Sequence, residues 1–293
     1  MKKDAIGDPL SRVDGRLKVT GKATYSGEYK LPGLTYGVLV PATITSGTVT
    51  AIDTKAAERA PGVLAVITHF NAIKVPGYQA DAAKPVKGLK LFNDNHIYFN
   101  GQPIALVVAE TFERATHAAS LVKATYQKQP FETNFHKNLD KGVTPQNGNY
   151  KDYSRGEANA YKNAPVKIEQ EYLQPSEMHN PMELHVTTAY WDGDNKVTLY
   201  TKSQGVVSSQ KAVATAFNLD PANVQINSRF VGGAFGSSLR TWPHEIAAVQ
   251  AAKMVKRPVK LTLTREQMFT LVGYRPLTIQ KIGLGATADG TIV

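Results

Sequence analysis

The stretch from residue 100 to residue 111, Asn-Gly-Gln-Pro-Ile-Ala-Leu-Val-Val-Ala-Glu-Thr, indicates the fold class of this chain. Asn100-Gly101 is a turn dipeptide, and residues 104–109 are an uninterrupted apolar run of strand length. Thr111 is a favoured N-cap, and the alanine-rich sequence that follows it as far as Val122 places its apolar residues on one helix face. A buried strand that leads into an amphipathic helix predicts α/β organisation.

The sequence before this stretch alternates short strands with short helices in the same way. Strands are predicted at 36–40, 48–52 and 63–68, where apolar residues are bounded by turn-forming residues. Asp53 can cap a helix that continues to Ala60, where the following proline and glycine end it. The first half therefore predicts an α/β domain.

The second half predicts a mixed α+β arrangement. Apolar residues alternate at 186–190 and 197–201 around an Asp-Gly-Asp-Asn turn, which predicts a β-hairpin. A helix is predicted at 209–217 and a strand at 224–230. Residues 127–162 have the composition of a linker. Because 293 residues exceed what one core usually holds, we predict two domains, 1–140 and 141–293.

The last residues predict an incomplete hairpin. Residues 277–284 have strand character, and Asp289-Gly290 is a strong turn dipeptide that only Thr291, Ile292 and Val293 follow. Two-stranded pairings this short are marginal, so we expect the continuation to come from a further chain or from sequence absent here.

Composition narrows the class of protein. Hydrophobic residues make up 42% and charged residues 20%, which is the globular range. The absence of cysteine excludes disulfides, thiolate metal sites and a cysteine-held iron–sulfur cluster in this chain. The apolar runs are far shorter than the roughly 20 residues of a membrane span, and residues 1–5 lack a secretory signal pattern. We therefore expect a cytoplasmic protein, or a periplasmic one only if a partner carries it.

The net charge of +10 raises the question of a nucleic-acid partner. The cations are scattered, and one denser stretch, with Lys84, Lys87 and Lys90, has the composition of a solvated loop. Lys253, Lys256 and Arg257 close a helical pattern, where the helix dipole favours cations. Because exposed aromatics are not interleaved with these residues, nucleic-acid binding is disfavoured.

The segment 231–238, Val-Gly-Gly-Ala-Phe-Gly-Ser-Ser, is the strongest candidate for a binding site. Closely spaced glycines let backbone N–H groups approach a ligand, which suits an anionic or oxo group. The spacing matches neither the Walker nor the Rossmann fingerprint. A tight turn around a packed phenylalanine is the alternative interpretation.

Two acidic residues are candidates for chemistry. Glu183 lies between His179 and His185, but this spacing fits no common metal motif, and structural hydrogen bonding is favoured over metal binding. Glu245 falls in the first turn of the helix after the glycine loop, where a carboxylate is favoured by the helix dipole.

Eight segments, in order along almost the whole chain, resemble the molybdopterin-binding large subunit of the xanthine dehydrogenase and aldehyde oxidase family. They are 19–25, 31–37, 60–63, 101–111, 178–183, 203–205, 232–236 and 273–276. The resemblance implies an α/β hammerhead domain at 1–140 and the first part of a mixed molybdopterin-binding domain at 141–293.

The implied function is that of a molybdenum hydroxylase, which oxidises aldehydes or N-heterocycles with oxygen derived from water. The resemblance implies a molybdenum–molybdopterin cofactor and leaves its dinucleotide form open. It also implies three partners, namely an iron–sulfur subunit, an FAD subunit and a C-terminal complement of the molybdopterin domain. The alternative is a non-catalytic assembly or cofactor-binding module of such a complex.

The resemblance also assigns roles to individual residues. Gln204 would hydrogen-bond an oxygen on molybdenum, and the loop backbone would contact the same face, with no side chain ligating the metal. The loop residues concerned are Gly232, Gly233, Ala234, Phe235 and Gly236. Arg275 would line the substrate funnel, where a guanidinium can bind a carbonyl or carboxylate, and its alternative is a surface arginine after a turn.

Two departures from the family pattern refine these expectations. Many members continue with Gly-Gly-Lys-Glu after the phenylalanine, whereas this chain has Gly-Ser-Ser followed by Leu239. The loss of the acidic side chain argues against purine recognition and favours an aldehyde. The family's glutamate base lies far downstream in sequence absent here, so this chain alone is expected to be inactive.

Overall fold

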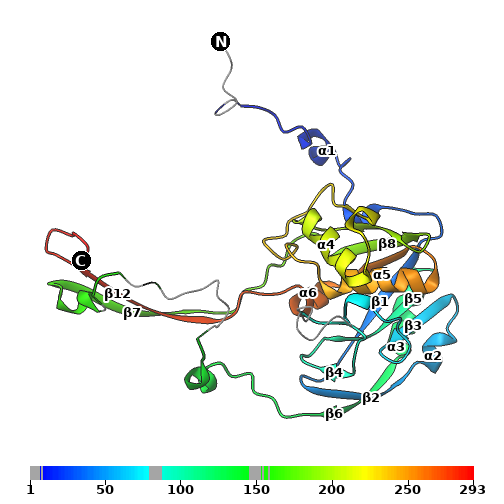
Figure 1. Ribbon diagram of the computed structural model, residues 1–293, viewed down its shortest axis with the longest axis horizontal. Helices are drawn as coiled ribbons and strands as arrows, with labels where there is room; N and C mark the ends of the chain where they lie inside the picture. Colours follow the sequence, from blue (N-terminus) through cyan, green and yellow to red (C-terminus); the bar gives the residue numbers. More distant parts are fainter. Residues whose placement is uncertain (1–6, 8, 79–87, 145–152, 154, 158) are drawn as a thin grey trace. The chain divides into compact units, whose positions relative to one another are not determined.

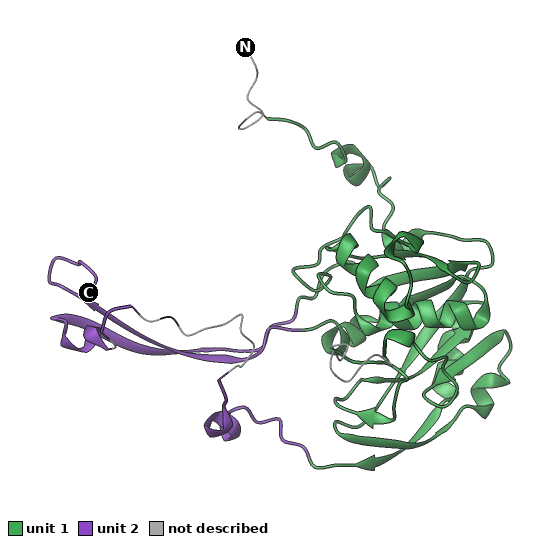
Figure 2. Ribbon diagram, in the orientation of Figure 1, with its two compact units in different colours: residues 1–130, 179–273 green, residues 131–178, 274–293 purple. Residues whose placement is uncertain are grey.

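The computed structural model, shown in Figure 1, describes residues 7, 9–78, 88–144, 153, 155–157 and 159–293. The chain forms two compact units, which Figure 2 distinguishes by colour. The first comprises 1–130 and 179–273, and the second comprises 131–178 and 274–293. Each unit therefore draws on two separate stretches of sequence.

The first unit is built on a seven-stranded sheet with the strand order β10-β9-β8-β11-β1-β5-β3. The strands are β1 (Thr35–Pro41), β3 (Val63–Thr68), β5 (Pro103–Ala109), β8 (Val186–Asp192), β9 (Lys196–Thr201), β10 (Val224–Asn227) and β11 (Val259–Thr262). β1 runs parallel to β11 and β9 to β10, whereas the other neighbours are antiparallel. The sheet combines strands from both sides of the boundary predicted near residue 140, and that boundary stays a prediction.

β5 is buried along its whole length because both of its faces are covered. Val107 packs with alanines of α2 (Lys55–Glu58) and α3 (Phe112–Leu121), whereas Leu106 and Val108 belong to the main core on the other face. Two covered faces explain why the strand is a continuous apolar run instead of an alternating one.

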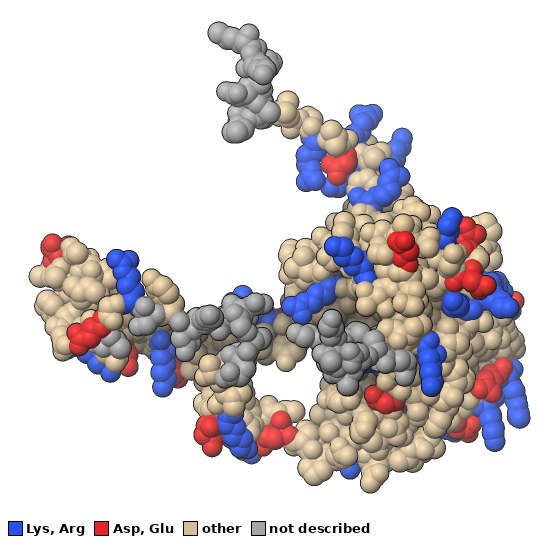
Figure 3. Space-filling view, in the orientation of Figure 1, with Lys and Arg blue, Asp and Glu red and all other residues tan. Residues whose placement is uncertain are grey.

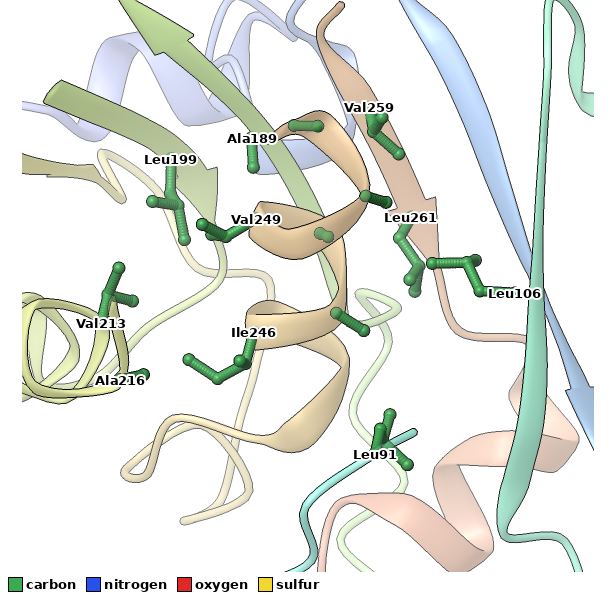
Figure 4. Packing of buried hydrophobic residues seen from close by; sticks show 14 of the residues in the cluster. Leu91, Leu106, Ala189, Leu199, Val213, Ala216, Ile246, Val249, Val259 and Leu261 are labelled. Atoms are coloured by element: carbon green, nitrogen blue, oxygen red, sulfur yellow. The ribbon is translucent and has the colours of Figure 1, made fainter. Parts of the chain in front are cut away.

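The main core lies between the sheet and two helices, α4 (Val206–Phe217) and α5 (Pro243–Val255). Figure 4 shows Leu199 and Leu261 of the sheet on either side of α5, which contributes Ile246 and Val249. The predicted helix at 209–217 is therefore confirmed, although it begins three residues earlier.

A second, three-stranded sheet in the first unit has the order β4-β2-β6. Its strands are β2 (Gly47–Asp53), β4 (His96–Ile97) and β6 (Lys123–Lys128). The predicted helix after Asp53 is present but ends at Glu58, and Asp53 Oδ1 accepts a hydrogen bond from Lys55 N at 3.1 Å. The predicted cap of α3 is confirmed, because Thr111 Oγ1 accepts from Arg114 N at 3.2 Å.

The remaining helical elements are short. They are α1 (Gly15–Val19), α6 (Arg265–Leu271) and the 3-10 turns η1 (Ser26–Glu28), η2 (Pro76–Tyr78), η3 (His136–Lys141), η4 (Ala160–Asn163) and η5 (Pro221–Asn223). Among the described residues, no helix has both the length and the apolarity that crossing a bilayer requires.

The second unit is an antiparallel ribbon of β7 (Val166–Gln174) and β12 (Thr278–Ala286), which pair along nine residues each. β7 has no counterpart among the predicted strands. The turn predicted at Asp289-Gly290 is present, but its return is limited to a single bridge between Ala286 and Ile292. The terminal strand therefore pairs mainly with β7 and not with the residues after the turn.

The positive charges are spread over the surface. Figure 3 shows Lys and Arg mixed with acidic side chains on the face in view, with a denser group around α1. Lys84 and Lys87 lie outside the described residues, and Lys90 Nζ donates to the Tyr78 carbonyl at 3.2 Å. Lys253 lies over the Trp191 ring, 4.2 Å from its centroid, near the C-terminal end of α5.

Glu245 caps the N-terminus of α5. Its Oε1 accepts a hydrogen bond from Trp242 N at 2.8 Å, and its Oε2 accepts one from Thr201 Oγ1 at 3.3 Å. Burial raises the pKa of this carboxyl to about 7, although both hydrogen bonds act in the opposite direction. The structural role that the sequence favours for Glu245 is therefore confirmed.

We expect Leu261→Ala to lower the free energy of unfolding by about 2–5 kcal/mol, because the side chain is fully buried and its loss leaves a cavity. Leu64→Ala is the matched control, since Leu64 lies on β3 of the same sheet but is 40% exposed, and it should cost less than about 1 kcal/mol. Denaturant unfolding measures both changes. Equal losses would contradict the position of β11 in the core.

We expect Glu245 to make stability depend on pH. Its folded pKa of about 7 lies above the ordinary value of 4.5, so the folded state holds the proton more tightly, and stability falls as pH rises between these values. Glu245→Gln keeps an acceptor oxygen but cannot ionise. The wild-type stability minus that of the variant should fall by up to about 3 kcal/mol over this range. A flat difference in denaturant unfolding between pH 4 and 8 would refute the assignment.

Candidate functional site

The chain segments that hold the candidate residues meet at one edge of the seven-stranded sheet. β8 begins at this edge, and β9, β10 and β11 all end there, because β8 is antiparallel to β9 and β11, and β10 is parallel to β9. The sequence just before β8, just after β9 and just after β10 is therefore brought together. Loops at the ends of sheet strands are common positions for binding sites.

The glycine loop follows β10 and has an unusual backbone. Gly233, Phe235 and Gly236 have φ angles of +87°, +55° and +98°. Phenylalanine is rarely found at positive φ, and the Phe235 side chain is also 74% exposed. The alternative of a turn around a packed phenylalanine does not describe this loop. Strain of this kind tends to occur at functional sites.

Four consecutive N–H groups of this loop, those of residues 233–236, have no acceptor in the described part of the chain. Hydrogen bonding resumes at Ser237 N, which donates to the Ala234 carbonyl at 3.0 Å. Successive unpaired backbone amides in a turn that contains left-handed residues can form a concavity that binds anionic or oxo groups.

Gln204 lies directly beside the loop. Its backbone N donates to the Ser238 carbonyl at 2.9 Å, and its side-chain Oε1 accepts from Ser238 N at 3.2 Å. With the oxygen engaged, the carboxamide NH₂ group is the part of this exposed side chain that can donate to a ligand. The structure thus brings together Gln204 and the glycine loop, as expected, while their role in binding stays a prediction.

The segment before β8 forms hydrogen bonds with both ends of the loop. Glu183 Oε2 accepts from Gly232 N at 2.7 Å, and Glu183 N donates to the Gly232 carbonyl at 3.0 Å. His185 Nε2 lies 3.1 Å from Ser237 Oγ. Within the described residues no group of three potential ligands could hold a metal ion, and both side chains are engaged in hydrogen bonding.

Several buried polar atoms around the loop have no partner among the described residues. They are His179 Nδ1, Glu183 Oε1, Ser238 Oγ, Thr241 Oγ1 and His244 Nδ1. Buried polar groups are normally hydrogen-bonded, so this concentration is expected of a surface that a polar ligand or further polypeptide completes. The sequence offered no signal for Ser238, which stands where many members of the resembled family have lysine.

The rim of the loop is apolar. Leu239, where the family has an acidic residue, is 57% exposed, and its N–H donates to the Gly236 carbonyl at 3.2 Å. Val206 and Val207, in the first turn of α4 just after Gln204, are also exposed. No carboxylate therefore stands at position 239 to recognise a heterocycle.

Arg275 belongs to the second unit. Its backbone pairs with that of Glu177, with N–O distances of 2.9 and 3.0 Å, and its side chain is exposed. The glycine loop belongs to the first unit, so the assignment of Arg275 to a substrate funnel stays a prediction.

Comparison with known families assigns both halves of the sequence. A family model described as "Molybdopterin cofactor-binding domain" matches residues 141–293, and one described as "Aldehyde oxidase and xanthine dehydrogenase, a/b hammerhead domain" matches residues 20–130.

Among curated proteins, the chain is similar to the aldehyde oxidoreductase molybdenum-binding subunit PaoC of Escherichia coli K12. The two share 38% identity over 98% of this chain and 38% of PaoC. The putative xanthine dehydrogenase molybdenum-binding subunit XdhA of the same strain is 27% identical over 96% of this chain and 39% of XdhA. The chain thus spans about two fifths of the length of these relatives.

Two solved structures share the fold. The aldehyde oxidoreductase of Desulfovibrio gigas aligns with a TM-score of 0.76 and 26% identity, over 96% of this chain and 33% of that chain. The quinoline 2-oxidoreductase of Pseudomonas putida 86 aligns with a TM-score of 0.82 and 21% identity, over 100% of this chain and 39% of that chain. With its hammerhead and cofactor-binding segments in this order, the chain belongs to the molybdopterin-binding family of the aldehyde oxidases and xanthine dehydrogenases.

Proposed function

We propose that this chain forms one wall of the molybdopterin site in a molybdenum hydroxylase that oxidises an aldehyde, with N-heterocycles as the second substrate class. The observation that carries the proposal is the row of four unpaired amides at 233–236 beside the Gln204 carboxamide. Family membership supplies the cofactor class, and we propose a hammerhead domain at 1–140 and the first part of the cofactor domain at 141–293.

The residues present fit an oxo-bearing cofactor. The unpaired amides supply donors and no negative charge, and the orphaned hydroxyl of Ser238 adds a further polar group. When bound, the cofactor would supply the redox centre that accepts electrons from the substrate. The chain's own part is to orient it, with the amides of Phe235 and Gly236 and the Gln204 NH₂ group donating to its oxygens.

The substrate preference follows from the rim. Exposed apolar side chains at Phe235, Leu239 and Val207 surround the amides, and an acidic partner for a purine is missing at position 239. A site without that hydrogen-bond partner discriminates poorly in favour of a heterocycle. Arg275 is proposed to bind a carbonyl or carboxylate of the substrate through its guanidinium.

We propose that electrons leave through an iron–sulfur centre outside these residues. The sequence contains no cysteine, so these residues do not supply thiolates for a cysteine-held cluster. Its relatives include a "molybdenum-binding subunit" and a "complex subunit gamma", names that describe members of assemblies. We propose an iron–sulfur subunit and an FAD subunit as partners of the complex.

The second unit supports a proposal for where the rest of the molybdopterin domain packs. One face of the β7–β12 ribbon is mostly apolar. Its apolar side chains, each about half exposed, are Val166, Ile168, Tyr172, Ile282 and Leu284, and Gln170 and Gln280 lie among them. On the other face Tyr161 packs against Gly283, and Glu171 forms an ion pair with Lys281 at 3.5 Å. Isolated two-stranded ribbons are marginally stable, so we propose that the C-terminal complement covers the apolar face.

We expect the assembled complex to copurify with molybdenum and pterin. Gln204→Ala should then lower aldehyde turnover about a hundredfold, because it removes a preorganised donor, while leaving the unfolding midpoint nearly unchanged. Gln225→Ala, an exposed glutamine on β10, is the matched control and should retain activity. A fully assembled complex without molybdenum would refute the proposal. A complex that contains molybdenum and pterin but does not turn over aldehyde would favour the alternative of a non-catalytic assembly or cofactor-binding module.

We expect Ile168→Lys or Ile282→Lys to abolish association with the C-terminal complement, because either places a charge in an apolar contact. Val143→Lys, at an exposed position of the same unit outside the ribbon, is the control and should assemble normally. Co-purification of tagged complement measures the effect. Assembly of the ribbon variants at wild-type yield would show that this face is not the contact.

A further inference from the structure

We propose that Glu183 and His185 are positioning residues that clamp the two ends of the glycine loop and thereby hold its unpaired amides in their binding geometry. Both come from the segment just before β8, which we call the brace, residues 179–185. The inference that the loop binds a cofactor rests on the proposed function. The hydrogen bonds that hold the loop do not depend on that function.

Glu183 holds the first end. Gly232 N donates to the carboxylate, and the Gly232 carbonyl accepts from Glu183 N, so a single residue engages both polar groups of the loop's first glycine. A Cβ on Gly232 would lie 2.8 Å from Glu183 Cβ, which is too close for a side chain. The close approach explains why this position is glycine although its φ is not positive.

The backbone and the carboxyl group of Glu183 have further polar neighbours. Lys202 Nζ donates to the Glu183 carbonyl at 2.7 Å, and both this ammonium and the Ser26 amide favour the ionised carboxylate. Burial and the nearby Glu28 act in the opposite direction, and the net effect is to raise the pKa of Glu183. The clamp therefore involves a half-buried carboxyl group whose Oε2 accepts the hydrogen bond from Gly232 N at 2.7 Å.

His185 holds the last end. Ser237 Oγ lies 2.8 Å from the Ala234 carbonyl and 3.1 Å from His185 Nε2. When the hydroxyl donates its only hydrogen to that carbonyl, His185 Nε2–H donates to Ser237 Oγ. Burial, with His244, Lys202 and His179 nearby, lowers the pKa of His185 to about 2. The imidazole is therefore neutral, and the contact fixes which nitrogen carries the proton.

The brace is anchored on its outer side. Arg265, the first residue of α6, donates to the carbonyls of Pro181 and Met182, at 2.5 and 2.9 Å. Leu263 N donates to the His185 carbonyl at 2.9 Å, and Trp242 Nε1 donates to the Ser237 carbonyl. Both ends of the loop are thus attached to the brace, and Ser237 is also attached to Trp242, the residue before α5. In the described part of the chain, the N–H groups of the four residues between have no acceptor.

The test uses Ser238 as a reporter, because its N–H donates to Gln204 and not to Glu183 or His185. Hydrogen–deuterium exchange is measured in the complete protein with its partners. We expect His185→Ala and Glu183→Ala each to accelerate exchange at Ser238 about tenfold. His185→Gln keeps a donor and Glu183→Gln keeps an acceptor, and both should restore exchange to within about threefold of wild type.

Val107→Ala is the matched control, since it removes buried volume from the α2–α3 cluster of the same unit and away from the loop. It should lower the unfolding midpoint without changing exchange at Ser238. Wild-type exchange in His185→Ala, or failure of both conservative variants to rescue it, would overturn the clamp. The molybdenum content of the wild-type complex tests the proposed function separately. If the complex contains no molybdenum but Ser238 is protected from exchange as expected, the proposed function is refuted and the clamp is not.

Discussion

A row of backbone N–H groups without acceptors can persist only if the structure around it prevents collapse into a hydrogen-bonded turn. In this protein the row is residues 233–236, and the constraint is the attachment of Gly232 to Glu183 and of Ser237 to His185. Phe235 at φ +55° with an exposed ring shows that local preferences do not select this conformation. Unlike a relaxed turn, the loop keeps its donors available.

The sheet topology brings these attachments together. The start of β8 and the ends of β9, β10 and β11 share one edge, so four segments far apart in sequence meet there. The stiffness of that edge comes from α5, whose buried face packs between Leu199 and Leu261 and whose first turn is capped by Glu245. Core packing and site geometry are therefore coupled through the same helix.

Local signals allowed much of the fold to be predicted. The apolar run of β5, the cap at Thr111 and the hairpin of β8 and β9 are visible because each depends on neighbouring residues. β10 ends at Asn227, three residues before the predicted end, because the chain leaves the sheet for the loop. β7 was not predicted, although Val166, Ile168 and Tyr172 alternate with polar residues as in a half-exposed strand. Its pairing with β12 could not be predicted either, because that strand lies beyond residue 277.

For the site, the sequence indicated the glycine loop and, through the family resemblance, Gln204. It could not indicate that His185 contacts Ser237, because 52 residues separate them and the contact depends on strand pairing. The parallel pairing of β1 with β11 is equally non-local, which is why one sheet spans both predicted domains.

The most direct test of the central claim is a crystal structure of the assembled, cofactor-loaded complex. If the amides of 233–236 bind the cofactor, an oxygen on the metal should lie within about 3.2 Å of the Phe235 or Gly236 nitrogen, with the Gln204 carboxamide beside it. A cofactor bound elsewhere, or a loop whose amides turn inward to protein carbonyls, would contradict the account.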